Sequence, residues 1–252
     1  MEKSTFDLLV WLWTAIALIV FLVLLFVTAP YGRHSNRNWG VSIPDRIGWF
    51  IMEVPALIVF LSLLFTGRAE KTVTVWIIAS LYVAHYINRA VIFPWRIRVR
   101  GKQMPLVIAL MAVFFNLMNA GFLGYYAGSF NTHFTVAWLR DPRFIAGLII
   151  FITGMAINIS SDEKLIHLRK KSNGDYQIPR GGYFEKISCP NFFGEIIEWG
   201  GYALLCWSLP AFSFFIWTFC NLVPRALSHH KWYRSHFPDY PQNRKAVFPY
   251  IL

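Results

Sequence analysis

The sequence predicts an all-α, polytopic membrane protein. The first observation is composition: of 252 residues, 56% are hydrophobic and only 15% are charged, whereas soluble domains have about 25% charged residues. The second is that apolar runs of bilayer-crossing length recur along the whole chain. The third is a net charge of +11 whose basic residues lie between these runs. The positive-inside rule and anionic lipid heads explain this pattern, so we expect membrane lipids as partners and no nucleic acid.

The apolar runs are the expected membrane helices, each of which needs about 20 mostly apolar residues. The first run is too long, and too acidic at its start (Glu2, Asp7), to be a cleaved signal peptide. The last run would measure about 45 Å as one helix. It is therefore either one tilted helix or two halves that break near Ser208-Leu209-Pro210. The six runs cover residues 8–29, 48–66, 73–93, 106–126, 144–159 and 194–223.

The distribution of Lys and Arg favours two halves for the last run. Most basic residues lie in alternate connections and in the C-terminal tail, and they all reach the cytoplasmic side only if the last run turns back on itself. We therefore expect one domain, residues 1–252, with seven transmembrane helices, the N-terminus outside and the C-terminus in the cytoplasm. The basic residues that decide this are Arg33, Arg37, Arg46, Arg96, Arg98, Arg100, Lys102, Lys164, Arg169, Lys170, Lys171, Arg180, Lys186, Arg225, Lys231, Arg234, Arg244 and Lys245.

The connection over residues 160–191 is the longest one expected. It contains Asn173-Gly174-Asp175, Pro179 and Gly181-Gly182, which are turn signals. Because long irregular segments in a compact domain are often functional, this connection is a candidate part of a site.

Polar side chains inside the apolar runs are the main functional signal, because a charge at mid-bilayer costs at least about 2.5–3.5 kcal/mol. Spacings of i, i+4 and i+7 put Tyr82, Tyr86 and Arg89 on one helix face. Helix packing alone is the alternative for any single Asn or Tyr, but polar residues used for packing are usually uncharged. We expect these groups to line one cavity open to the cytoplasm. The others are Glu53, Asn116, Asn119, Asn158, Asp162, Asn191, Glu195, Glu198, His229, His230 and Tyr233.

Several other chemistries lack their motifs in this sequence. There is no Gly-x-Gly-x-x-Gly after a strand, no Walker loop and no nucleophile elbow. Cys189, Cys206 and Cys220 have neither metal spacing nor a disulfide pattern. His229 and His230 would point about 100° apart on a helix, so they cannot readily chelate one metal. We expect no metal site and no obligate protein partner.

Several sequence blocks resemble the steroid 5α-reductase family, and the similarity covers most of the chain. The most specific block is Asn191-Phe-Phe-Gly-Glu-Ile-Ile-Glu-Trp199. The resemblance is closer to the type 2 branch than to polyprenol or enoyl-CoA reductases. A bacterial homologue is expected, located in the inner membrane; a eukaryotic one would lie in the endoplasmic reticulum membrane. The other blocks are Trp49-Phe-Ile-Met-Glu-Val-Pro55, His85-Tyr-Ile-Asn-Arg89, Asn158-Ile-Ser-Ser-Asp162, Leu168-Arg-Lys170, Tyr176-Gln-Ile-Pro-Arg-Gly-Gly-Tyr-Phe184, His229-His-Lys-Trp-Tyr233 and Tyr240-Pro-Gln-Asn-Arg-Lys-Ala246.

The resemblance implies a seven-helix fold and hydride transfer from NADPH to the carbon–carbon double bond of a 3-oxo-Δ4 steroid, such as testosterone or progesterone. By motif position, Glu53 and Tyr86 are the catalytic residues at the 3-keto oxygen, and Trp49 and Asn119 line the substrate site. The N-terminal half would mainly form the substrate pocket, and residues 144–252 the NADPH site. The implied cofactor residues are Arg89, Asn158, Asp162, Arg169, Tyr176, Asn191, Glu195 and Tyr233, with Glu198, His229 and Arg244 in the same polar framework.

The expected mechanism is that Glu53 and Tyr86 share a proton and polarise the ketone, since an apolar site favours a protonated carboxyl group. Two other functions stay open. A membrane methyltransferase of the isoprenylcysteine or phospholipid type would bind S-adenosylmethionine and would not need Glu53. A small-molecule transporter would use the buried charges as a permeation path, although the chain lacks the paired interrupted helices of inverted-repeat carriers.

Overall fold

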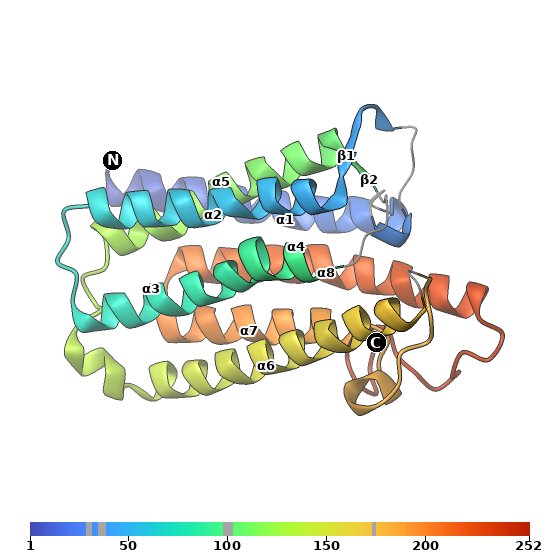
Figure 1. Cartoon of the computed structure of the whole chain (residues 1–252). Coiled ribbons are helices and arrows are strands. Elements are labelled where there is room, and N and C mark those ends of the chain that lie inside the picture. Colours follow the sequence, from blue (N-terminus) through green and yellow to red (C-terminus); the bar gives the residue numbers. More distant parts are fainter. Residues whose placement is uncertain (29–31, 35–38, 98–102, 173–174) are drawn as a thin grey trace. The chain divides into compact units, whose positions relative to one another are not determined.

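The computed structural model describes residues 1–28, 32–34, 39–97, 103–172 and 175–252, and most of them are helical (Figure 1). Arg37, Arg98, Arg100, Lys102, Asn173 and Gly174, used above, lie outside these residues. The expected all-α class is confirmed, apart from two short strands. The long helical segments are α1 (Lys3–Phe26), α2 (Asp45–Thr66), α3 (Val73–Tyr86), which continues through the π-helix η3 (Ile87–Ile92) into α4 (Phe93–Arg96), α5 (Leu106–Ser129), α6 (Pro142–Lys171), α7 (Pro190–Cys206) and α8 (Leu209–His236).

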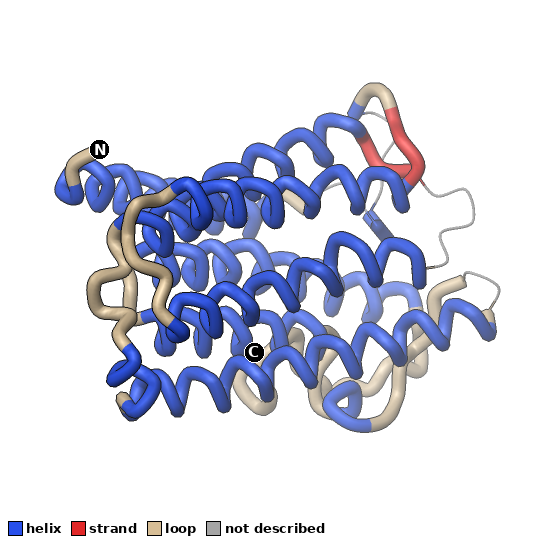
Figure 2. The backbone as a smooth tube through the Cα atoms, turned by 60° about the vertical axis from the view of Figure 1, so that its left-hand side comes forward, coloured by secondary structure: helices blue, strands red, loops and turns tan. Residues whose placement is uncertain are grey.

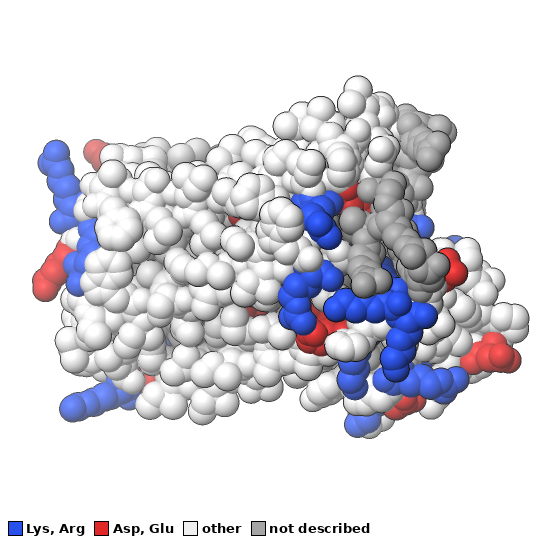
Figure 3. All heavy atoms as spheres, viewed as in Figure 1, with Lys and Arg blue, Asp and Glu red and all other residues white. Residues whose placement is uncertain are grey.

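Five helical segments of the described chain are long and apolar enough to cross a bilayer: α1, α2, the continuous run from α3 to α4, α5 and α6. Their outward side chains are apolar; on α1, for example, Leu8, Leu12 and Ile19 are more than half exposed. On the face drawn in Figure 3, the flanks of the helices carry very few charged side chains. Such a surface suits lipid and not water, so the protein is an integral membrane protein.

The last apolar run forms two helices, with a break close to the expected position at Ser208-Leu209-Pro210. Helix α7 ends at Cys206 and α8 begins at Leu209. Between them Trp207 adopts a left-handed conformation with φ of 42°, which is rare for a residue with a side chain. Pro210 then occupies the first turn of α8, where its missing N–H is tolerated.

Two helix ends predicted from hydropathy were wrong. Helix α6 does not stop near residue 159 but continues to Lys171, and α8 passes through Pro224 to His236. After residue 159 in α6, and after Pro224 in α8, the side chains become more polar but remain compatible with a helix, so each helix extends beyond its apolar run. The connection after α6 is correspondingly shorter than expected. The short elements are η1 (Gly32–His34), β1 (Ser42–Pro44), β2 (Gln103–Pro105), η4 (Val136–Arg140) and η5 (Gly182–Glu185).

The chain divides into two compact units. Unit 1 contains Met1–Val10, Pro30–Ile145 and Leu205–Ala211. Unit 2 contains Trp11–Ala29, Ala146–Leu204 and Phe212–Leu252.

In unit 1, two parallel helices start from a small antiparallel strand pair. Strands β1 and β2 pair with Ile43 opposite Met104, and each strand leads directly into a helix, α2 or α5 (Figure 2). Glycine then allows the two helices to pack closely: a Cβ on Gly124 of α5 would lie 2.7 Å from the carbonyl oxygen of Phe60 on α2. This contact fixes which residues of α2 and α5 face each other further along the pair.

The continuous helix from α3 to α4 contains a wider, π-helical segment. This segment lies near the end that is expected on the cytoplasmic side. Pro94, in α4, has no N–H, and its ring would clash with the carbonyl of Ala90 in a regular helix. The six residues of η3 precede it and relieve that clash. Such wider turns are often found at functional sites, and Arg89 lies in this one.

In unit 2, glycines bring α6 and α7 into backbone contact. A Cβ on Gly194 would lie 2.5 Å from the backbone nitrogen of Asn158, and one on Gly201 would lie 2.7 Å from the carbonyl oxygen of Gly147. Close approach through small residues is the usual packing of membrane helices. The C-terminal tail covers the end of this pair: Ala246 accepts a hydrogen bond from the Cys189 N–H and packs in one apolar cluster with Phe192.

Candidate functional site

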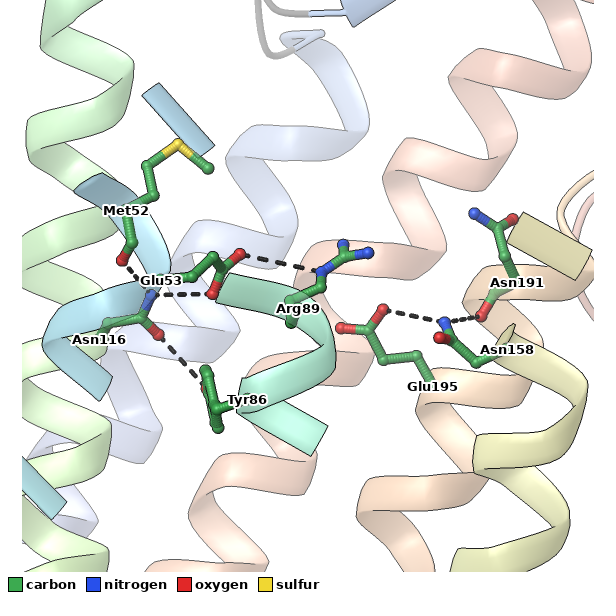
Figure 4. A network of polar contacts seen from close by, with 8 residues as sticks. All are labelled: Met52, Glu53, Tyr86, Arg89, Asn116, Asn158, Asn191 and Glu195. Atoms are coloured by element: carbon green, nitrogen blue, oxygen red, sulfur yellow. Dashed lines mark hydrogen bonds and ion pairs between the residues drawn. The ribbon is translucent and has the colours of Figure 1, made fainter. Parts of the chain in front are cut away.

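The first polar cluster lies in unit 1 and is centred on Asn116 of α5. Its Nδ2 donates to the backbone carbonyl of Met52 at 2.7 Å and to Glu53 Oε2 at 3.3 Å, both on α2. Its Oδ1 accepts a hydrogen bond of 3.4 Å from the Tyr86 hydroxyl of α3. Asn116 is 4% exposed. Figure 4 shows this side chain between the Glu53 carboxyl group and the Tyr86 ring. The two residues expected to be catalytic are thus brought together through a third.

Arg89 completes this cluster. Its Nε lies 3.9 Å from Glu53 Oε1, and the two side chains are only 14% and 13% exposed. The guanidinium lies over the Trp49 ring at 4.8 Å and over Phe93 at 5.1 Å, in cation–π geometry. A guanidinium this far from water needs polar or aromatic partners, and the Glu53 carboxyl group and the two rings supply them. Arg89 was expected at the cofactor; the structure places it against Glu53 and Trp49, and its cofactor role stays a prediction.

Asn119 is the remaining residue expected at the substrate. It is 3% exposed, and its Nδ2 donates to the Phe115 carbonyl, one turn earlier in α5, at 2.8 Å. Its role in binding substrate therefore stays a prediction.

The second polar cluster lies in unit 2, where α6 meets α7. Asn158 Nδ2 donates to the Asn191 carbonyl at 2.9 Å and lies 3.4 Å from Glu195 Oε2 (Figure 4). Asn191 Nδ2 donates in turn to Asp162 Oδ1 at 3.0 Å. The spacing of Asn158 and Asp162 on α6 matches that of Asn191 and Glu195 on α7, and the glycine contacts bring the two faces together. Four of the expected cofactor residues thus form one hydrogen-bonded group.

A third, aromatic group lies at the ends of α6 and α8. The Arg169 guanidinium lies 4.9 Å from the centre of the Tyr176 ring, which contacts the Trp232 ring at 5.1 Å. Tyr233 is 2% exposed and stacks on Tyr240 with centroids 5.2 Å apart. Arg169, Tyr176 and Tyr233 were all expected at the cofactor, and they share this region of unit 2.

The tail holds the segment between α6 and α7 in place. Arg244, which is 2% exposed, donates from Nη1 to the Pro179 carbonyl at 2.9 Å, and its Nη2 lies 3.5 Å from Glu185 Oε2. The Gly181 backbone N–H, which donates to Glu185, and the Arg244 guanidinium lower the pKa of Glu185. Gly181 has φ of 83°, a left-handed conformation that favours glycine. The turn signal read from Gly181-Gly182 is therefore confirmed.

Unit 2 contains further buried polar groups. Glu198 is fully buried on α7, and His229 stacks on Phe192 with centroids 5.6 Å apart. Ser188 Oγ lies 2.6 Å from His230 Nδ1 and 2.7 Å from the Tyr240 hydroxyl. Burial raises the pKa of Tyr240. Sequence reasoning did not single out Ser188, because one Ser in a connection carries no signal of its own.

Among the described residues, no group of three or more His, Cys, Asp or Glu side chains could hold a metal ion. What the three groups offer is hydrogen bonding, cations and flat aromatic surfaces. These properties fit an organic anion with aromatic rings in unit 2, and a polar oxygen acceptor beside Tyr86 in unit 1.

The chain matches known proteins over its whole length. The sequence model of the 3-oxo-5-alpha-steroid 4-dehydrogenase family matches residues 102–252. A steroid 5-alpha-reductase DET2 from Gossypium hirsutum is 41% identical over 244 residues, which cover 94% of this chain and 93% of the relative. The Bos taurus 3-oxo-5-alpha-steroid 4-dehydrogenase 1 is 38% identical over 258 residues, covering 100% of this chain and 98% of the relative. The Homo sapiens protein of the same name is 37% identical over 256 residues, covering 100% and 97%.

The resemblance stated from sequence blocks is confirmed by these comparisons. The relatives named above are DET2 and type 1 proteins, so a closer relation to the type 2 branch stays a prediction.

Proposed function

Because the chain belongs to the 3-oxo-5-alpha-steroid 4-dehydrogenase family, we propose that its polar clusters hold the two reactants of that family's reaction. The chain is an oxidoreductase that reduces the carbon–carbon double bond of a 3-oxo-Δ4 steroid to the 5α product. We assign the substrate to the Glu53–Asn116–Tyr86 cluster of unit 1 and the cofactor to the clusters of unit 2. The substrate assignment rests on the buried Tyr86 hydroxyl, which Asn116 links to Glu53 through two hydrogen bonds.

The chemistry of an enone explains why these groups suit the substrate. Addition of hydride to the β-carbon of an enone moves negative charge onto the carbonyl oxygen. Hydrogen-bond donors aimed at that oxygen stabilise the transition state, and they are most effective where water is excluded. The Tyr86 hydroxyl is such a donor, and Glu53 adds a second one in its protonated form. The α-carbon of the resulting enolate then takes a proton that comes ultimately from water, which completes the reduction.

We propose NADPH as the cofactor. When bound, NADPH supplies the hydride. The Arg169 guanidinium, 4.9 Å from the centre of the Tyr176 ring, can bind a phosphate through its N–H donors. The amide and carboxyl groups of the Asn158–Asn191–Asp162–Glu195 cluster are suited to ribose hydroxyls and to a carboxamide, because they combine donors with acceptors.

We also propose that the chain crosses the membrane seven times, with its N-terminus outside and its C-terminus in the cytoplasm. Beyond the five segments that meet the length and hydropathy criteria, α7 and α8 are separate helices joined by a short turn. Helix α7 has 17 residues and would span about 26 Å. This topology puts the basic connections and tail on the cytoplasmic side. A bacterial protein would lie in the inner membrane, and a eukaryotic one in the endoplasmic reticulum membrane.

The proposal is tested by incubating the purified protein with NADPH and either testosterone or progesterone. We expect NADPH oxidation together with one molar equivalent of the 5α-reduced steroid, identified by mass spectrometry against authentic 5α and 5β standards. Failure to reduce several 3-oxo-Δ4 steroids, combined with binding of S-adenosylmethionine, would support a methyltransferase instead. The preference for NADPH is tested in the same assay with NADH at equal concentration.

A further inference from the structure

The amide group of Asn116 can adopt only one orientation in its surroundings. Its Nδ2 faces two acceptors, the carbonyl oxygen of Met52 at 2.7 Å and Glu53 Oε2 at 3.3 Å. Exchanging the amide nitrogen and oxygen would place Oδ1 against the Met52 carbonyl, an arrangement with two acceptors and no hydrogen. The amide oxygen therefore faces Tyr86.

This orientation gives the Tyr86 hydroxyl an acceptor, the amide oxygen of Asn116. An amide oxygen only accepts hydrogen bonds, and a phenol has one hydrogen to give. At 3.4 Å the contact is at the long end for an O–H donor, whose usual separation is about 2.7–2.8 Å. Asn116 thus holds the hydroxyl hydrogen of Tyr86 weakly, while the same side chain holds one oxygen of Glu53.

We propose that Asn116 is a positioning residue for the reduction: it orients the Tyr86 hydroxyl and the Glu53 carboxyl group, and it gives up the hydroxyl hydrogen to the ketone oxygen as charge develops there. The inference rests on the proposed function, because it needs Tyr86 to act on a ketone. An oxygen that becomes negative is a stronger acceptor than an amide, so the exchange of partners is favourable in the transition state. Asn116 itself transfers no proton in this scheme.

The geometry distinguishes Asn116 from a buried Asn that serves the backbone. Asn131, just after α5, is also buried, and its Nδ2 donates to the carbonyl oxygens of Ala127 and Glu70. Asn116 shares one such contact, to Met52, but it also contacts two titratable side chains from two different helices. A purely structural Asn does not require that second set of partners.

The experiment is a double-mutant cycle in the full-length protein, with Asn116→Leu, Tyr86→Phe and the combination of both. A misplacement of about 1 Å at a reacting group costs on the order of 10²-fold, so Asn116→Leu should lower kcat by about 10- to 100-fold and leave KM for NADPH unchanged. If Asn116 acts through the Tyr86 hydroxyl, adding Asn116→Leu to Tyr86→Phe should lower kcat much less than it does in the wild type. Loss of the same factor in both backgrounds would overturn the proposal.

Asn131→Leu is the matched control, because it removes two amide hydrogen bonds from another buried Asn of unit 1. It should lower the melting temperature but leave kcat unchanged. If it lowers kcat as much as Asn116→Leu does, the effect is general destabilisation and the proposal fails.

Asn116→Asp provides a second variant in case Asn116→Leu does not fold. It has the same shape and still accepts from Tyr86, but it offers no donor to Met52 or Glu53 when ionised. We expect a similar loss of kcat; wild-type turnover by Asn116→Asp would overturn the proposal. Wild-type protein is assayed in parallel: if it reduces no 3-oxo-Δ4 steroid, the proposed function itself is wrong, whereas an active wild type with active Asn116 variants refutes only this inference.

Discussion

Asn158 on α6 and Asn191 on α7 are joined by a hydrogen bond of 2.9 Å, from the side-chain amide of the first to the backbone carbonyl of the second. Because the acceptor is main chain, the bond fixes the position of α7 itself relative to the Asn158 side chain. The Asn191 side chain is then directed to Asp162 at 3.0 Å. Two helices and three polar side chains are thereby held in one arrangement, which suits a site that must be preformed before its ligand binds.

Gly194→Ala should disrupt this arrangement. The added Cβ would lie 2.5 Å from the backbone nitrogen of Asn158 and 2.7 Å from the carbonyl oxygen of Gly154, and backbone atoms cannot give way as side chains do. The helices must separate, at a cost of about 1–3 kcal/mol. We expect about tenfold or greater weakening of NADPH binding, measured by fluorescence titration, together with a lower melting temperature.

Gly121→Ala is the control for this variant, since a Cβ on Gly121 would meet no atom within 4 Å. It should leave both the NADPH dissociation constant and the melting temperature close to wild type. Unchanged NADPH affinity in Gly194→Ala would show that the α6–α7 contact does not shape the cofactor site.

Glu53→Gln and Tyr86→Phe should lower turnover more than they lower substrate binding. Each variant keeps nearly the shape of the original side chain: Tyr86→Phe removes a donor near the ketone oxygen, and Glu53→Gln replaces the acidic O–H donor of a carboxyl group by a weaker amide N–H donor. Loss of one such donor costs on the order of 10²–10³-fold in kcat. We expect losses of that order in steady-state assays, with the steroid dissociation constant changed several-fold at most. If kcat stays the same while binding weakens, the residues hold the substrate without stabilising the transition state.

The sequence predicted which residues belong to the polar clusters better than it predicted which of them contact one another. Glu53 and Arg89 stand out because charges are expensive in an apolar run, and that cost can be read directly from the sequence. The i, i+4, i+7 spacing placed Tyr86 and Arg89 on one face, and both do contact the Asn116–Glu53 group. The five apolar segments and the break between α7 and α8 were also readable from hydropathy and Pro210.

The bridging position of Asn116 could not be predicted, because it depends on which helices are neighbours. That choice is made by the strand pair before α2 and α5 and by the contact of Gly124 with Phe60, and spacing within one helix carries no such information. The contact of Arg89 with Glu53 was missed for the same reason: the charge of Arg89 suggested a phosphate, whereas this carboxyl group belongs to another helix, α2.

Arg169→Gln should weaken NADPH binding. The guanidinium is held over the Tyr176 ring, so little conformational freedom is lost when it binds a phosphate. A charge-assisted hydrogen bond contributes about 1.5–3 kcal/mol, which corresponds to about a 10- to 100-fold change in the dissociation constant. Titration with NADPH checks this. Lys171→Gln, an exposed charge removed two residues later, should change affinity less than threefold; equal effects of both variants would point to a general electrostatic attraction.

The segment between η5 and α7 should loosen in acid because of Glu185. The Gly181 N–H and the Arg244 guanidinium, with Arg180 also nearby, lower the pKa of this carboxyl group. A lowered pKa in the folded state means that the ionised form stabilises the segment above the ordinary value of 4.5 and that this contribution disappears as the pH falls through the lowered value. We expect hydrogen exchange of residues 179–189 to be slow at pH 7 and faster, relative to α7, at pH 3–4. In Glu185→Gln the neutral amide resembles the protonated acid, so exchange should already be fast at pH 7 and should no longer respond to acid. A full acid response in that variant would assign the transition to a group other than Glu185.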